Sequence, residues 1–199
     1  GGDLRLTSDI PLTADQTQRL PPVTSESVLA TAHGRVNLAS LASRGEVIPS
    51  DQELTLQGQG GKIAVANTLV ELSGNGGGAA FIRAGQLVLD NAIIRSNTLG
   101  NQDGQDISLK VTEAAYLSGV NGEFSVATVS YKNAGGIFVE TPYLEMTNAL
   151  IHTGATLAGA AGPIEIRANQ VSLKDGAMIG SAVVGTGDTG DLTLNVTER

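Results

Sequence analysis

Residues 135–183 read GGIFVETPYLEMTNALIHTGATLAGAAGPIEIRANQVSLKDGAMIGSAV, a stretch that contains one pattern twice. Each copy starts with glycine and an alternating apolar run, at 137–141 in the first copy and at 164–168 in the second. A second alternating run, a third apolar patch and a turn rich in small residues follow in both copies. Three successive runs of period two cannot form one amphipathic helix, so they predict short β-strands. Strands this short bury an apolar side only when the copies stack on one another.

The first apolar pair of each copy recurs along the chain, with one residue between its two members. These pairs are Val36/Leu38, Ile63/Val65, Ala80/Ile82, Ile107/Leu109, Ile137/Val139, Ile164/Ile166 and Leu192/Leu194. Five of the six intervals between successive pairs cover 27 to 30 residues, which indicates a repeat architecture. The remaining interval, from Ile63 to Ala80, covers 17 residues and predicts a shortened turn that lacks one strand.

Glycine precedes nearly every pair, as expected where the chain makes a sharp corner between strands. Stacking at ~4.8 Å lets each strand hydrogen-bond to the equivalent strands above and below. We therefore predict an all-β protein, a right-handed parallel β-helix (β-solenoid) of about seven coils, each with 27–30 residues and three short strands. The array is expected to cover 34–199 and to stop in mid-repeat. Residues 1–33, interrupted by Pro11, Pro21 and Pro22, are expected to form an irregular cap or excursion.

The composition argues against several classes of protein. With 12 basic and 20 acidic residues the net charge is −8, and no basic run occurs, so we expect no nucleic-acid binding. Because the chain has no cysteine, it has neither disulfides nor thiolate metal sites. No apolar stretch approaches the ~20 residues that a membrane-spanning helix needs, so we expect no membrane span.

The strings at 135–181 and at 104–119 (GQDISLKVTEAAYLSG) resemble the long repeat arrays of filamentous-haemagglutinin-like surface proteins of Gram-negative bacteria. The resemblance covers about residues 60–199. It implies a right-handed β-helix that is exported by a two-partner route and is displayed or released as an adhesin or filament. The Asn-Pro motifs of that family's secretion domain are absent from this sequence, so the export route rests on the resemblance alone.

No motif predicts a catalytic, cofactor-binding or metal site with specificity. Residues 185–190 (GTGDTG) match the spacing of a dinucleotide-binding loop, but the alternating run after them predicts a strand, whereas such a loop must open a helix. We interpret them as a corner turn. His33 and His152 lack metal-ligand spacing. His152 falls where Arg95 falls in an equivalent repeat, which predicts an outward or turn position.

Four aspartates beside corner glycines leave one weak metal alternative open. They repeat the spacing Asp-x-x-Asp and are Asp103, Asp106, Asp188 and Asp191. Such oxygen ligands suit Ca²⁺, although solvated turns explain the same residues, and we predict no cofactor. Carboxylates on a β-helix face also serve polysaccharide lyases and glycosidases, an alternative that requires acids and bases to converge on adjacent turns.

One outward column of the first strand in each repeat carries mixed charge. Its members are Arg83, Lys110, Glu140, Arg167 and Asn195. Stacking in register would place Glu140 between Lys110 and Arg167, at ~4.8 Å from each along the ladder. The neighbouring cations Arg83 and Lys110 would then be a mild liability, although long side chains can extend into water.

Together these features predict a non-catalytic structural or adhesive section of a β-helical filament or adhesin, located outside the cell or on its surface. Its expected partners are adjacent repeats or further copies of the same chain joined end to end, and cell-surface glycans or proteins. Two alternatives stay open. One is a polysaccharide-active β-helix of the lyase or glycosidase kind, and the other is a tail-fibre-like trimeric rod that binds glycans.

Overall fold

The computed structural model describes residues 4–7, 27–128 and 131–198, and every regular element in these ranges is a β-strand. The strands are β1 (Leu4–Thr7), β2 (Ser27–Ala30), β3 (Arg35–Ala39), β4 (Glu46–Pro49), β5 (Leu54–Gln57), β6 (Lys62–Ala66), β7 (Thr68–Glu71), β8 (Ala79–Asp90), β9 (Ile93–Thr98), β10 (Ile107–Thr128), β11 (Ile137–Ala155), β12 (Ile164–Lys174), β13 (Met178–Val183) and β14 (Leu192–Val196). Within these ranges, no helix is long and apolar enough to cross a membrane.

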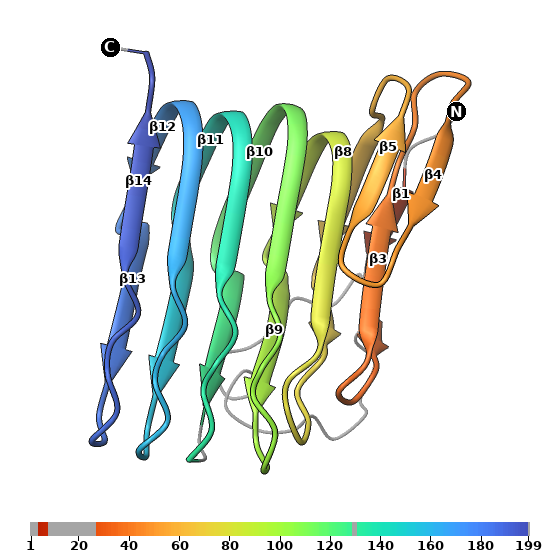
Figure 1. Ribbon diagram of the computed structural model, residues 1–199. Coiled ribbons are helices and arrows are strands. Elements are labelled where there is room, and N and C mark those ends of the chain that lie inside the picture. Colours follow the sequence, from red (N-terminus) through yellow and green to blue (C-terminus); the bar gives the residue numbers. More distant parts are fainter. Residues whose placement is uncertain (1–3, 8–26, 129–130, 199) are drawn as a thin grey trace.

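Equivalent strands of successive turns lie side by side and pair in parallel, in three ladders (Figure 1). The first ladder contains β3, β8, β10, β11, β12 and β14. The second contains β1, β6 and the later parts of β8, β10, β11 and β12. The third contains β2, β7, β9, β13 and the last parts of β10 and β11. The chain is therefore a parallel β-solenoid.

The predicted count of about seven coils is wrong, because the stack has about four regular turns, from β8 to the start of β14. Part of the error originates at Ile63, which pairs with Leu87 in the second ladder and is not a first-ladder residue. The first-ladder neighbour of Val36 is Ala80, 44 residues later in the chain. A shortened 17-residue turn is therefore absent. In addition, β10 and β11 continue without a break over 22 and 19 residues, so separate short strands are not seen there.

An antiparallel hairpin accounts for the long step between Val36 and Ala80. β4 and β5 pair with each other in a small separate sheet, inserted between β3 of the first ladder and β6 of the second. The hairpin lies at the N-terminal end of the stack, and β5 contacts β8 (Figure 1). Leu54, the first residue of β5, is only 1% exposed, so one side of the hairpin packs on the solenoid.

Alternate residues of the first ladder point inward and form continuous apolar columns, as predicted. One column consists of Val36, Ala80, Ile107, Ile137, Ile164 and Leu192. Its members from Ala80 to Ile164 are at most 1% exposed, whereas Leu192 on β14 is 51% exposed. The core is thus closed by strands on both sides through most of the stack and loses its cover at β14.

At the other end, β1 and β2 add to the second and third ladders. Leu4 lies opposite Ile63, and Ser27 lies opposite Thr68. Residues 8–26 lie outside the described ranges. The predicted boundary at residue 33, between a cap and the repeat array, therefore stays a prediction.

Residues with positive φ make the corner between the second and third ladders; most are asparagine or glycine, and Asp175 has φ 52° in the last turn. Asn67, Asn91, Gly119 and Asn148 have φ values of 47°, 47°, 86° and 50°. Most side chains are strained in this left-handed region, while glycine and asparagine adopt it most readily. Asn91 Nδ2 also donates to Asn67 Oδ1 at 2.9 Å, so side chains link the corners of these two turns.

Candidate functional site

The mixed-charge column of the first ladder has the predicted register. Lys110 pairs with Arg83 on one side and with Glu140 on the other. Glu140 in turn pairs with Arg167, which pairs with Asn195. The prediction that Glu140 lies between Lys110 and Arg167 is confirmed. Since all five residues occupy one outward position on five consecutive rungs, they form a single line along the solenoid.

Two ion pairs neutralise most of the charge on this line. Lys110 Nζ lies 3.0 Å from Glu140 Oε1, and both side chains are about half exposed. Arg167 pairs within its own strand, with NH2 at 2.5 Å from Glu165 Oε1. Exposed pairs of this kind contribute only about 0–1 kcal/mol to stability. They can therefore exchange partners with a ligand at little cost.

Arg83 does not extend into water. It is 6% exposed and lies under the hairpin, where Nε donates to the Leu54 carbonyl at 2.7 Å. Its NH1 donates to the carbonyl oxygens of Ile82 and Ser108, and NH2 donates to Ser108 Oγ. Burial lowers the pKa of Arg83 from its ordinary value, against the nearby carboxylates. These hydrogen bonds compensate the guanidinium for lost water and fasten β5 to the solenoid.

A second arginine attaches the hairpin from its other side. Arg35 stacks over the Phe81 ring, with its guanidinium carbon 4.1 Å from the ring centroid. The Arg35 guanidinium also donates to the backbone carbonyls of Ser50 and Glu53. The hairpin is therefore held by two cations that flank Phe81, and its backbone forms a wall at one end of the charged line.

Three hollows border this line. The hollow beside the hairpin has about 160 Å³, the middle one about 190 Å³ and the one at the next corner about 510 Å³. Lys110 lines all three, while Glu140 and Arg167 line the middle and corner hollows. We name these three hollows together the trough.

Acids, bases and one aromatic ring converge in the middle of the trough. Its lining contains three carboxylates and three cations, namely Glu53, Glu140, Glu165, Arg83, Lys110 and Arg167. Phe138 lies between Ser108 and Glu165 in the ladder and lines the same hollow. Phe81, Ser108 and Phe138 occupy successive rungs of one outward column. The charged side chains of this surface can donate hydrogen bonds to a polar ligand and accept them from it, while Phe138 covers one apolar face of the ligand.

A cluster on the second ladder was not predicted from the sequence. Tyr116 and Tyr143 meet edge to face, with ring centroids 5.9 Å apart. Tyr143 donates to Glu145 Oε2 at 2.7 Å, and Lys174 donates to the same oxygen at 2.7 Å. The hydrogen bond to Glu145 raises the pKa of Tyr143, and the hydrogen bond from Lys174 lowers the pKa of Glu145. Only the register, which brings residues of adjacent turns together, reveals this cluster.

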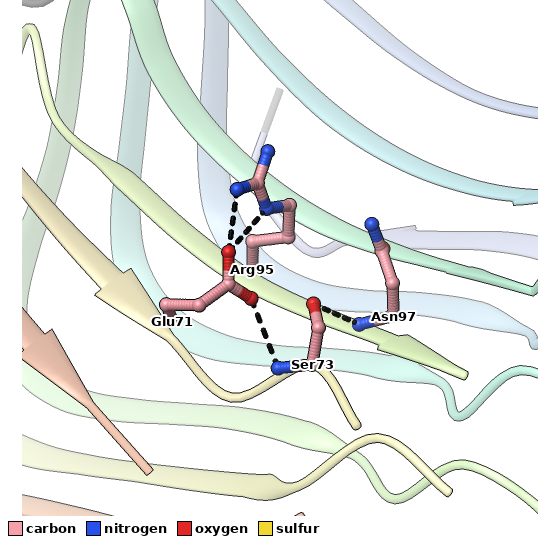
Figure 2. Close-up of polar contacts among 4 residues, drawn as sticks. All are labelled: Glu71, Ser73, Arg95 and Asn97. Carbon is pink, nitrogen blue, oxygen red and sulfur yellow. Dashed lines mark hydrogen bonds and ion pairs between the residues drawn. The ribbon is translucent and has the colours of Figure 1, made fainter. Parts of the chain in front are cut away.

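The third ladder carries a buried ion pair between successive turns (Figure 2). Glu71 lies opposite Arg95, and their side chains are 10% and 11% exposed. Arg95 Nε and NH2 both donate to Glu71 Oε2, at 2.9 and 2.5 Å. Figure 2 shows that the network continues, because the Ser73 amide donates to Glu71 Oε1 and the Asn97 amide donates to Ser73 Oγ. These contacts join successive turns in a little-exposed part of the third ladder, so we assign the four residues a structural role.

The histidines and the glycine-rich string lie apart from the trough. His152 is in the third ladder and shares its outward position with Arg95, through Ser125 between them, as predicted. His33 lies in the turn before β3 with φ 56°. Residues 185–190 form the bend between β13 and β14 and open no helix, which confirms the interpretation as a corner.

The corner aspartates bind backbone groups of the next turn. Asp103 Oδ1 accepts from the Asn133 amide at 2.9 Å, and Asp106 Oδ1 accepts from the Gly136 amide at 2.7 Å. Asp191 lies three rungs from Asp106, so the two Asp-x-x-Asp strings do not meet. Across the described ranges, no group of three or more His, Asp or Glu side chains could hold a metal ion. The Ca²⁺ alternative is not tested by these contacts and stays a prediction.

No family model, no curated protein and no solved structure matches this chain.

Proposed function

We propose that this chain is a non-catalytic structural section of an extracellular or cell-surface β-helical filament or adhesin. The proposal includes a right-handed coil of the filamentous-haemagglutinin-like kind and end-to-end contact with further repeats or further copies. Support comes from the parallel stack itself, in which every turn offers the next one a complete set of backbone hydrogen-bonding groups.

The observation that carries this proposal is the state of the core at β14. Leu192, Leu194 and Val196 are 51%, 48% and 44% exposed, although the equivalent residues one turn earlier are buried. One further parallel strand would cover the apolar column and satisfy the edge of β14. An exposed sheet edge with an apolar row is a template for such pairing.

Light scattering over a range of protein concentrations tests end-to-end contact. We expect the average mass to rise with concentration, and we expect Leu192→Ser with Leu194→Ser to abolish the rise. Val47→Ser on the hairpin, which is also partly exposed in the parent chain, serves as the matched control and should leave association unchanged. If the parent chain and both variants keep a monomer mass at every concentration, the proposal is contradicted.

A second candidate function is binding or cleavage of a polysaccharide, and the trough favours it. Glu140, Glu165 and Lys110 converge there from adjacent turns, as this alternative requires. An assay for new reducing ends or unsaturated sugars separates binding from cleavage. Turnover that Glu140→Gln or Glu165→Gln removes would support an enzyme, whereas binding without turnover supports a recognition surface.

A further inference from the structure

The trough has the shape needed for an elongated ligand. Arg83, Lys110, Glu140, Arg167 and Asn195 occupy five consecutive rungs. With ~4.8 Å between rungs, the line they form is about 19 Å long. The middle hollow is lined from four of these rungs, Arg83 to Arg167, and the corner hollow from four, Lys110 to Asn195. A site lined from four successive rungs along the solenoid axis suits a linear polymer better than a compact small molecule.

The hairpin gives the trough a closed end. Leu54 is 1% exposed, and Arg83 beneath it hydrogen-bonds to its carbonyl group. Glu53 of the same segment lines the hollows next to this wall. A polymer would therefore lie with one end near the hairpin.

The charge of the lining argues for a neutral ligand. Three carboxylates and three cations line the middle hollow and cancel, whereas the chain as a whole has a net charge of −8. Lys110 and Arg167 are already paired with Glu140 and Glu165, so neither sign dominates the surface. A polyanion would lie against three carboxylates, and a polycation against three cations. A ligand with many hydroxyl groups can donate to the carboxylates and accept from the cations.

The uncharged part of the lining agrees with this chemistry. Thr112 and Asn169 line the corner hollow, are exposed, and offer further hydroxyl and amide groups. Phe138 in the middle hollow offers an aromatic surface, of the kind that covers the apolar face of a sugar ring.

We propose that the trough binds an extended, neutral oligosaccharide, with one sugar ring on Phe138 and its hydroxyl groups hydrogen-bonded to Glu140, Glu165, Lys110 and Arg167. This inference rests on the second candidate function and specifies its ligand and its site. It requires no bond to be made or broken.

Isothermal titration calorimetry with cellohexaose, maltohexaose and laminarihexaose tests the inference, with polygalacturonate and heparin as anionic probes. We expect at least one neutral hexasaccharide to bind, and we expect Phe138→Ala and Arg167→Gln each to weaken binding by about tenfold or more. Lys174→Gln is the matched control, because Lys174 forms a similarly exposed ion pair outside the trough, with Glu145. It should leave the affinity unchanged.

Two results would overturn the inference: no heat of binding from any neutral hexasaccharide at millimolar concentration, or binding that neither trough variant weakens. Binding of the anionic probes alone, if lost in Arg167→Gln, would overturn the neutral ligand while keeping the glycan-binding candidate. Light scattering on the same samples reports end-to-end association independently. Association without any saccharide binding would therefore remove this inference and leave the filament proposal intact.

Discussion

Glu140 lies directly opposite Lys110 in the pairing of β11 with β10, and its Oε1 atom lies 3.0 Å from Lys110 Nζ. The other strand neighbour of Glu140 is Arg167. A carboxylate between two cations reduces their mutual repulsion, and opposite charges on neighbouring strands contribute about 0.2–1 kcal/mol per pair. The order of charges along this column therefore favours the observed register.

Replacing Glu140 with lysine should lower the midpoint of thermal unfolding by roughly 1–4 °C at low salt, because four cations would then occupy successive rungs. The loss should shrink in 1 M salt, where exposed charges are screened within about 3 Å. Glu46→Lys on the hairpin makes the same charge change outside the column and should shift the midpoint less. An effect of Glu140→Lys that is independent of salt would contradict this account.

Arg83→Met should detach the hairpin more than it destabilises the stack. Methionine fills similar space but leaves the carbonyl groups of Leu54 and Ser108 without their donor, at a cost of about 1–3 kcal/mol. We expect faster proteolysis within 46–57, measured by mass spectrometry of limited digests. Arg167→Met, which removes an exposed arginine from the same column, should leave the digestion rate unchanged. Equal rates in both variants would show that Arg83 does not hold the hairpin.

The repeat pattern predicted the inward columns because alternation along a strand is a local property. It could not identify the ladder to which a pair belongs, since Ile63 with Val65 looks the same in the first ladder as in the second. The position of Arg83 depends on a hairpin whose contact residue, Leu54, lies 29 residues earlier. The trough also depends on this hairpin, which lies far from the charged column in the sequence. Its charged column was predictable from period and register, but its wall comes from an insertion that interrupts the period.

The buried pair of Glu71 and Arg95 should be strongly coupled (Figure 2). Arg95→Met leaves a buried carboxylate without its partner, so we expect a loss of about 3–5 kcal/mol in the free energy of unfolding. Glu71→Gln combined with Arg95→Met should recover part of this loss, since no uncompensated charge then remains. Denaturant unfolding of the two single variants and the double variant measures the coupling. Additive losses would contradict a direct interaction.

In the tyrosine cluster, the pKa of Glu145 and the pKa of Tyr143 are shifted in opposite directions. The pKa of Glu145 is lowered, so its contribution to stability is present above its unfolded pKa and is lost as pH falls through its folded pKa. The pKa of Tyr143 is raised, because the neutral phenol donates to Glu145. Absorbance titration near 295 nm should show one tyrosine that ionises above the usual value of about 10. Glu145→Gln should bring that pKa down, and Tyr143→Phe should remove the shifted component. A titration that Glu145→Gln leaves unchanged would exclude the hydrogen bond as the cause.

The corner between the second and third ladders offers a test of backbone conformation. Asn91 has φ 47° and donates to Asn67 Oδ1. Both Asn91→Gly and Asn91→Ala remove this hydrogen bond, but only alanine is strained in the left-handed region, by about 1–2 kcal/mol. The extra freedom of glycine in the unfolded chain offsets part of this difference. We therefore expect Asn91→Ala to be less stable than Asn91→Gly by up to about 1 kcal/mol in denaturant unfolding.

Asn148 provides an independent copy of the same test, since its φ is 50° two turns later. Asn148→Ala should again be less stable than Asn148→Gly. At Asn195, which lies in the extended strand β14, the order should reverse, because glycine is disfavoured in strands. If alanine and glycine variants are equally stable at Asn91 and at Asn148, the left-handed conformation is not what selects asparagine at these corners. The recurrence of asparagine and glycine there would then need another cause, of which the side-chain link from Asn91 to Asn67 is the first to test.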